Sequence, residues 1–143
     1  MDADGLFLYG PLREGGAQHG WLKRTGFEGL CGAWTPGRLF HLAELDTPAL
    51  VPGPIPGDLP PGPGWVFGEF VGYEGEAELE AAVENLDALE GVAEDRTERR
   101  LIPVLLEGGQ VYKAWAWIHP EDRLPRLERE ALELKGGDWK DYL

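Results

Sequence analysis

Short runs of apolar and aromatic residues, interrupted by glycine and proline, recur along most of the chain and predict strands more often than helices. The clearest runs cover residues 6–9 and 65–73. A further pair of runs, residues 101–107 and 110–118, flanks the dipeptide Gly108-Gly109. A glycine pair between two apolar runs is typical of a two-residue β-hairpin. These segments therefore predict a sheet built mostly from antiparallel neighbours.

Two further strands are expected over residues 27–34 and 37–43, because the tripeptide Thr35-Pro36-Gly37 between them is typical of a turn. The next stretch, residues 48–64, is rich in proline and glycine, which disfavour regular structure. We interpret it as a long surface loop, of the kind that often forms a lid or rim beside a site. Pro103, inside a predicted strand, indicates a sheet edge or a bulge.

Residues 76–89 carry the clearest helical pattern. Their apolar side chains recur every three or four positions, and Gly91 supplies a terminator just beyond the last of them. Shorter helices are expected over residues 17–24 and 124–134, the latter with Pro125 in its first turn. Strands that outnumber helices predict an α+β domain with a curled, largely antiparallel sheet or small barrel. We expect one domain over residues 1–143.

The formal net charge of −13 argues against nucleic acid and anionic membrane surfaces as main partners, because both attract clustered Lys and Arg. The apolar run at residues 6–9 is too short to span a bilayer and lacks the features of a signal peptide. The few basic residues cluster at Arg13, Lys23-Arg24 and Arg96-Arg99-Arg100. We interpret most of them as exposed surface charges, while small anionic ligands stay an alternative.

Cys31 is the only cysteine, so no intramolecular disulfide can form, and a cytoplasmic location is favoured. It is more typical of a small buried residue than of a nucleophile. The histidines, His19, His41 and His119, are scattered, and no His/Cys pair has the spacing of zinc ligands, so we predict no metal. The chain contains no serine, which excludes serine nucleophiles and directs attention to carboxylates.

Glu90 is the carboxylate with the most distinctive position, at the end of the predicted helix and directly before Gly91. The negative end of a helix dipole disfavours a carboxylate charge, so we expect the pKa of Glu90 to be raised, and partial burial would act in the same direction. A raised carboxyl pKa suits a general base that works near neutral pH. The alternative is a solvated glutamate without a functional role.

The first predicted strand ends in Tyr9-Gly10-Pro11-Leu12, and Gly15-Gly16 follows shortly after. Glycine allows a ligand to approach the backbone closely, and successive N–H groups in such a turn can hold a carboxylate or phosphate. The glycine spacing does not match the known dinucleotide or P-loop patterns. An ordinary turn without a ligand is the alternative.

Several short segments along the chain match a set of family motifs in both order and spacing. The segments are Tyr9-Gly10-Pro11-Leu12 (Tyr-Gly-Ser/Thr-Leu), residues 46–51 (Gly-Tyr-Pro-Ala-Leu-Val), residues 66–70 (Val-x-Gly-Glu-Leu/Val), residues 86–91 (Leu-Asp-x-x-Glu-Gly), Arg99 with Ile102 and Val104 (Arg-x-x-Val-x-Val) and residues 137–139 (Gly-Asp-Trp). Together they cover nearly the whole chain. The chain thus resembles the γ-glutamylcyclotransferase-like (AIG2-like) superfamily, and within it most closely the bacterial γ-glutamylamine cyclotransferase-like proteins.

This resemblance implies an α+β fold with a small mixed, largely antiparallel β-barrel, flanking helices and a cavity for a γ-glutamyl group. It implies that the substrate cyclises to 5-oxoproline with release of an amine or amino acid, without a cofactor. Glu90 matches the family's catalytic glutamate, a general acid/base, whereas Tyr9, Gly10, Pro11 and Leu12 match its substrate-binding motif. The resemblance therefore predicts that Glu90 points into a cavity lined by Tyr9 and the backbone of residues 10–12.

Two residues depart from the family pattern. Pro11 replaces a Ser or Thr, which removes a hydroxyl and a backbone N–H, and Thr97 stands where many members have Tyr. A non-catalytic protein that binds a small ligand in the same cavity is therefore an alternative function. An adaptor that uses the tryptophans and the proline-rich segment is a third. Neither the leaving group nor the oligomeric state follows from the sequence.

Overall fold

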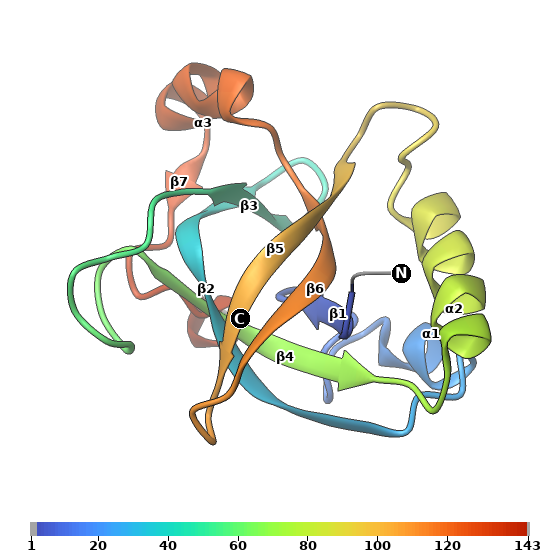
Figure 1. Ribbon diagram of the computed structural model, residues 1–143. Helices are drawn as coiled ribbons and strands as arrows, with labels where there is room; N and C mark the ends of the chain where they lie inside the picture. The colour runs from blue at the N-terminus through green and yellow to red at the C-terminus, as the bar shows by residue number, and fades with distance from the viewer. Residues whose placement is uncertain (1–2, 143) are drawn as a thin grey trace.

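A closed β-barrel forms the body of the molecule in the computed structural model, which describes residues 3–142 (Figure 1). Its strands are β1 (Gly5–Leu8), β2 (Gly29–Leu42), β4 (Trp65–Gly72), β5 (Glu98–Leu106) and β6 (Val111–Ile118). Two further strands, β3 (Thr47–Pro52) and β7 (Leu132–Glu133), pair with β2 outside the closed ring. The hydrogen-bonded order is β3-β2-β4-β1-β6-β5, and β2 also pairs with β5, which closes the barrel. Strands β1 and β6 run parallel, whereas the other barrel neighbours are antiparallel. The predicted small mixed barrel is confirmed.

The helices lie outside the barrel, with α1 and α2 together on one side and α3 beside β7 (Figure 1). They are α1 (His19–Lys23), α2 (Glu76–Leu89) and α3 (Leu124–Glu130), with short 3-10 turns at Glu121–Arg123 and Trp139–Tyr142. Helix α2 has the predicted bounds. Among residues 3–142, no helix has both the length and the apolar character needed to cross a bilayer.

Helix α3 is shorter than predicted, because the chain becomes extended at Ala131 and β7 follows it. Strand β7 pairs with β2, and the N–H of the buried Leu134 donates to the carbonyl of Leu39 over 2.7 Å. The prediction of one helix over residues 124–134 is therefore wrong at its C-terminal end. Pairing with a distant strand, which local periodicity does not reveal, decides the conformation of this segment.

The predicted turn at residues 35–37 is also wrong, because β2 runs through it without interruption. The strand changes partner there: Pro36 is the last residue paired with β4, and Gly37 is the first paired with β3. Strand β3 occupies the first residues of the stretch that we expected to be a loop, so the irregular segment is confined to residues 53–64. A strand that moves from one neighbour to another tolerates proline, because its ladder is broken at that point.

Pro103 lies inside β5, where its position agrees with the predicted sheet edge. It pairs in register with Lys113 of β6, whereas the pairing of β5 with β2 involves only Leu105 and Leu106. The carbonyl of Pro103 accepts a hydrogen bond from the hydroxyl of Thr35 over 2.8 Å. Since the N and C=O of a strand residue point to the same side, the missing N–H also faces β2, beyond the end of that ladder.

Strand β1 is buried along its whole length and separates two apolar clusters. Phe7 belongs to the cluster inside the barrel. Leu6 and Leu8 belong to the cluster between the barrel and α2, which also contains Leu12 and Leu86. Because successive strand residues face opposite sides, one strand contributes to both layers. This packing brings the loop after β1 close to the C-terminal end of α2.

The close approach of Gly137 to β4 makes this glycine a stability determinant. Gly137 has φ +74°, and a Cβ built there would lie 2.2 Å from the carbonyl oxygen of Trp65. Gly26 has a similar φ of +71° but open space around its Cα. We expect Gly26→Ala to lower the free energy of unfolding by about 1 kcal/mol, the backbone term alone. Gly137→Ala should cost about 1–3 kcal/mol more through overlap with β4.

Chemical denaturation of the two variants beside the parent protein measures this difference. Equal losses in the two variants would show that the segment around Gly137 moves away from β4 without penalty, and the proposed close contact would then carry no stability.

Candidate active site

A cavity of about 250 Å³ opens between the end of β1, the end of α2 and the start of β3. All the residues predicted from the sequence line it: Tyr9, Gly10, Pro11, Leu12 and Glu90. The other lining residues are Phe7, Leu8, Gln18, Leu42, Leu45, Thr47, Pro48, Leu89, Arg96, Thr97, Trp117 and His119. The structure thus brings together two motifs that lie far apart in the sequence.

The end of α2 fixes the position of Glu90. Glu90 is the last residue with helical backbone angles, and Gly91 follows with φ +72°. The N–H of Gly91 donates to Ala88 over 3.4 Å and the N–H of Val92 donates to Asp87 over 3.1 Å. This pair of bonds is the Schellman arrangement that ends helices at glycine. The hydroxyl of the buried Thr97 donates to the carbonyl of Glu90 over 3.0 Å, which holds the returning chain against the same helix end.

Burial raises the pKa of Glu90 above its ordinary value, and the positive charge of Arg96 partly offsets this effect. The direction agrees with the expectation from the sequence, with burial as the largest cause. The side chain of Glu90 is half-buried and lines the cavity, so its carboxylate is accessible to a small molecule there. A carboxyl group that holds its proton to higher pH than usual can both accept and return a proton near neutrality.

Tyr9 contributes a neutral ring to the cavity. Its hydroxyl donates to the backbone carbonyl of Trp117, and its ring stacks on that of Phe7 at a centroid distance of 6.4 Å. Burial, and next the negative charge of Glu90, raise the pKa of Tyr9 far above its ordinary value. The phenol therefore stays protonated, with its only hydrogen directed to Trp117, and is suited to position a ligand rather than to exchange protons with it.

The loop after β1 lines the cavity and contains backbone N–H groups without a described protein partner. Within the described residues, the N–H groups of Gly10 and Leu12 donate to no protein acceptor, whereas the carbonyls of Gly10 and Pro11 accept from Arg13 and Gln18. Pro11 between the two donors has no N–H. Two unpaired N–H groups beside a cavity are suited to bind an anionic oxygen.

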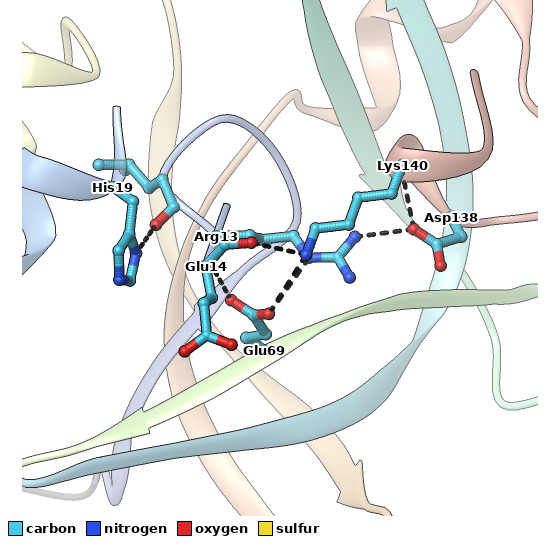
Figure 2. A network of polar contacts seen from close by, with 7 residues as sticks. Arg13, Glu14, His19, Glu69, Asp138 and Lys140 are labelled. Carbon is cyan, nitrogen blue, oxygen red and sulfur yellow. Dashed lines mark hydrogen bonds and ion pairs between the residues drawn. The ribbon is translucent and has the colours of Figure 1, made fainter. Parts of the chain in front are cut away.

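A cluster of charged side chains around the buried Arg13 holds this loop in place (Figure 2). Arg13 is only 2 % exposed; its guanidinium binds Asp138 over 2.7 Å and lies 3.8 Å from Glu69. Glu69 in turn accepts from the backbone N–H of Glu14 over 2.8 Å, and Lys140 donates to the carbonyl of Glu14 over 2.6 Å. The prediction that Arg13 is an exposed surface charge is wrong, because residues distant in the sequence enclose it.

His19 supports the loop from its other side. Its Nδ1 donates to the carbonyl of Leu12 over 2.9 Å (Figure 2). The ring of His19 also packs near Phe27, at a centroid distance of 6.2 Å. Cys31, by contrast, is exposed rather than buried as we predicted. Partial desolvation of its thiol, and next the charge of Glu107, raise the pKa of Cys31 above its ordinary value, which disfavours a thiolate nucleophile.

Sequence reasoning did not find five polar residues of the cavity: Gln18, Thr47, Arg96, Thr97 and His119. Arg96 looked like part of a surface cluster, and Thr97 was noted only as a departure from the family pattern. His119 had no partner at metal-ligand spacing. Their positions in the sequence could have indicated a role for three of them. Arg96 and Thr97 closely follow the glycine that ends α2, and His119 directly follows β6.

Comparison with known proteins identifies the family of this chain. The sequence profile of the family described as gamma-glutamyl cyclotransferase, AIG2-like, matches residues 6–141. The chain therefore belongs to the AIG2-like γ-glutamyl cyclotransferase family. Comparison with curated protein sequences finds no match.

Solved structures share the fold at low sequence identity. A mouse AIG2-like protein is 18% identical, with a TM-score of 0.57 over 82% of this chain and 78% of the mouse chain. YkqA from Bacillus subtilis is 19% identical, with a TM-score of 0.60 over 98% of this chain and 40% of its own. A protein specific to uropathogenic E. coli is 14% identical, with a TM-score of 0.59 over 99% and 96%.

The raised pKa of Glu90 predicts a pH-dependent effect of Glu90→Gln on stability. Below its ordinary pKa of 4.5, the carboxyl is protonated in the folded and the unfolded protein alike. As the pH rises through that value, the unfolded chain releases this proton first. The stability of the folded protein therefore falls with rising pH until the folded-state pKa is passed, and stays at the lower level above it. Glutamine does not ionise. We therefore expect the Tm of Glu90→Gln minus that of the parent to increase from acidic to neutral pH.

Thermal unfolding at a series of pH values measures this difference. Glu94→Gln removes the same charge from an exposed residue that does not line the cavity, and serves as the control. A Tm difference for Glu90→Gln that stays constant with pH would show that the pKa of Glu90 is the same in both states.

Proposed function

We propose that this protein is a γ-glutamyl cyclotransferase that converts a γ-glutamyl compound to 5-oxoproline and releases an amine or amino acid, with Glu90 as general acid/base. The observation that carries the proposal is the accessible Glu90 carboxylate, with its raised pKa, in one cavity with the free N–H groups of Gly10 and Leu12. Membership in the family supports the same reaction class. The substrate is a small molecule, and the reaction uses no cofactor.

The proposed reaction needs a base, an oxyanion site and a short distance between the reacting atoms. Glu90 takes a proton from the substrate α-ammonium, and the resulting amine attacks the γ-carbonyl carbon. A five-membered ring closes, and the carbonyl oxygen carries negative charge until the bond to the departing nitrogen breaks. In total, two protons move from the attacking to the departing nitrogen, and Glu90 transfers them. No water is consumed.

The loop after β1 supplies the donors in this proposal. The N–H groups of Leu12 and Gly10 are the candidates for the developing oxyanion and for the substrate α-carboxylate. Tyr9, whose own hydrogen is committed to Trp117, packs against the γ-glutamyl chain. Enclosure of the substrate in a small cavity keeps amine and carbonyl within reach of each other, which favours ring closure.

One observation favours a second function, a binding protein without turnover. Pro11 removes one N–H from the loop that the family motif places beside the reacting carbonyl. Retention of Glu90 at its motif position supports catalysis instead, because ligand binding alone does not require a carboxylate with a raised pKa. The assay for 5-oxoproline over a panel of γ-glutamyl peptides and γ-glutamyl amines separates the two functions. A cytoplasmic location, which the single cysteine favours, would suit such substrates.

Glu90→Gln should lose most of the activity while the protein stays folded. Glutamine keeps the size of the side chain but cannot exchange a proton, and loss of a positioned general acid–base lowers the rate by about a hundredfold or more. The measurement is kcat for 5-oxoproline formation, with circular dichroism as the check on folding. Glu94→Gln should keep the parent activity. Full activity in a folded Glu90→Gln protein would refute the mechanism.

Pro11→Thr should raise activity if the site is catalytic. The substitution restores an N–H and a hydroxyl next to the proposed oxyanion position, and one such donor contributes on the order of a hundredfold in other enzymes. A protein that only binds its ligand should instead change affinity without gaining turnover. The measurement is kcat on the best substrate of the panel. Parent activity equal to or above that of Pro11→Thr on every substrate would show that this donor is not needed.

A further inference from the structure

Among the polar side chains of the cavity without a task in the proposed reaction are Arg96 and His119. Arg96 is the one cationic side chain among the described lining residues, and the chain as a whole carries a net charge of −13. A lone arginine beside a cavity in so acidic a protein is suited to an anionic group of a ligand.

The backbone places Arg96 over the helix end that carries Glu90. The N–H of Arg96 donates to the carbonyl of Gly91 over 2.9 Å, which closes the segment between them. A Cβ on Gly91 would lie 2.1 Å from Nε of Arg96, so the guanidinium occupies the space that the absent side chain leaves. Gly91 therefore serves both the helix end and the placement of this charge.

The guanidinium of Arg96 makes few contacts with polar groups of the protein. Its one hydrogen bond to a described residue, to the carbonyl of Leu89, is long at 3.4 Å, and no described carboxylate lies within ion-pair distance. Its charge nevertheless acts on Glu90, whose pKa it lowers. The residue is exposed, so the guanidinium stands at the mouth of the cavity with most of its N–H groups available.

His119 supplies a second donor with a defined hydrogen. Its Nδ1 lies 3.1 Å from Nη1 of Arg123, and because arginine can only donate, Nδ1 is the acceptor and Nε2 carries the hydrogen. Burial, and next the charge of Arg123, lower the pKa of His119 to about 4, so the imidazole is neutral at neutral pH. It can therefore donate a hydrogen bond without adding a positive charge beside Glu90.

Arg123 holds the two donors in a fixed relation. Besides its contact with His119, it donates to the carbonyl of Arg96 over 2.8 Å and to the carbonyl of Asp95 over 2.7 Å. The same guanidinium thus connects the end of β6 to the segment that carries Arg96. Such second-layer contacts are typical of sites whose donors must keep their orientation.

Resting on the proposed cyclotransferase function, we propose that Arg96 and His119 bind a carboxylate of the leaving group, so that γ-glutamyl amino acids and peptides are preferred over γ-glutamyl amines. The free N–H groups of Gly10 and Leu12 provide for the anionic oxygens of the γ-glutamyl part. The leaving nitrogen must lie within reach of Glu90, which protonates it. The group attached to that nitrogen then extends toward the exposed mouth of the cavity, where Arg96 lies.

The test uses two substrates that differ only in this carboxylate: γ-glutamylalanine and γ-glutamylethylamide. We expect the parent to have the higher kcat/KM on γ-glutamylalanine. In Arg96→Gln the ratio of the two kcat/KM values should fall by roughly tenfold or more, the value of a hydrogen bond between charged groups. Any change in the pKa of Glu90 affects both substrates and cancels in the ratio. Arg96→Lys should recover part of the preference.

Arg100→Gln is the matched control, because it removes the same charge from a residue that does not line the cavity. Arg100 lies on β5 and forms ion pairs with Glu98 and Glu121. This variant should leave the ratio unchanged. An equal loss on both substrates in Arg96→Gln would assign Arg96 to the α-carboxylate of the γ-glutamyl group and overturn the proposal. Parent kcat/KM values on both substrates would overturn it as well.

Binding measurements separate this proposal from the proposed function. The Kd values of both compounds are measured by calorimetry in the Glu90→Gln background, with and without Arg96→Gln. If the parent turns over neither compound, the cyclotransferase function fails, but the ratio of the Kd values still decides whether Arg96 recognises the carboxylate. Tighter binding of γ-glutamylalanine that disappears with Arg96→Gln supports the inference, and equal binding of the two compounds contradicts it.

Discussion

The burial of β1 on both faces is the constraint on which the rest of the structure depends. Phe7 packs inside the barrel while Leu6 and Leu8 pack against the layer of α2. A strand fixed from two sides cannot shift its register without exposing one set of side chains. The loop that follows it therefore leaves the barrel at a defined place, next to the end of α2. The candidate active site is formed where these two elements end.

The negative charge of Glu90 is only partly balanced by a nearby positive charge, and the packing around Glu90 is the reason. Burial disfavours its ionised form, and Arg96, although close enough to affect it, does not form an ion pair with it. A direct ion pair would stabilise the carboxylate and lower its pKa further. The raised pKa of Glu90 lowers the stability of the folded state at neutral pH. In return, it makes Glu90 a proton acceptor with a pKa nearer to neutral pH than that of an exposed glutamate.

Local patterns were sufficient for those parts of the fold in which the chain interacts with its near neighbours. The apolar spacing of α2 and its terminator Gly91 predicted the observed helix. The glycine pair predicted the hairpin of β5 and β6, but not its two-residue loop, because the pairing of Leu105 with Val111 centres the turn on Gly108. The errors occurred where a distant strand decides the conformation. The sequence at residues 35–37 is typical of a turn, yet β2 continues because β3 replaces β4 as its partner. Strand β7 replaces a helical turn for the same reason.

The candidate site divides in a similar way. Glu90 and the loop of Tyr9 to Leu12 were found because each lies in a contiguous motif. The buried state of Arg13 could not be predicted, because its partners Glu69 and Asp138 come from two other regions of the chain. His119 could not be assigned either. Its neighbour in the sequence, the end of β6, gives no sign of the cavity that β1 and α2 form beside it.

The ion pair between Arg13 and Asp138 also has a consequence for biosynthesis. The cavity loop is translated well before Asp138 and Lys140, which hold it and lie more than 120 residues further along the chain. The loop therefore leaves the ribosome without its charged partners, and the site cannot be completed until they follow. Contacts between residues so distant in the sequence form late in folding. Ligand recognition should accordingly begin only after the segment that carries Asp138 has been translated.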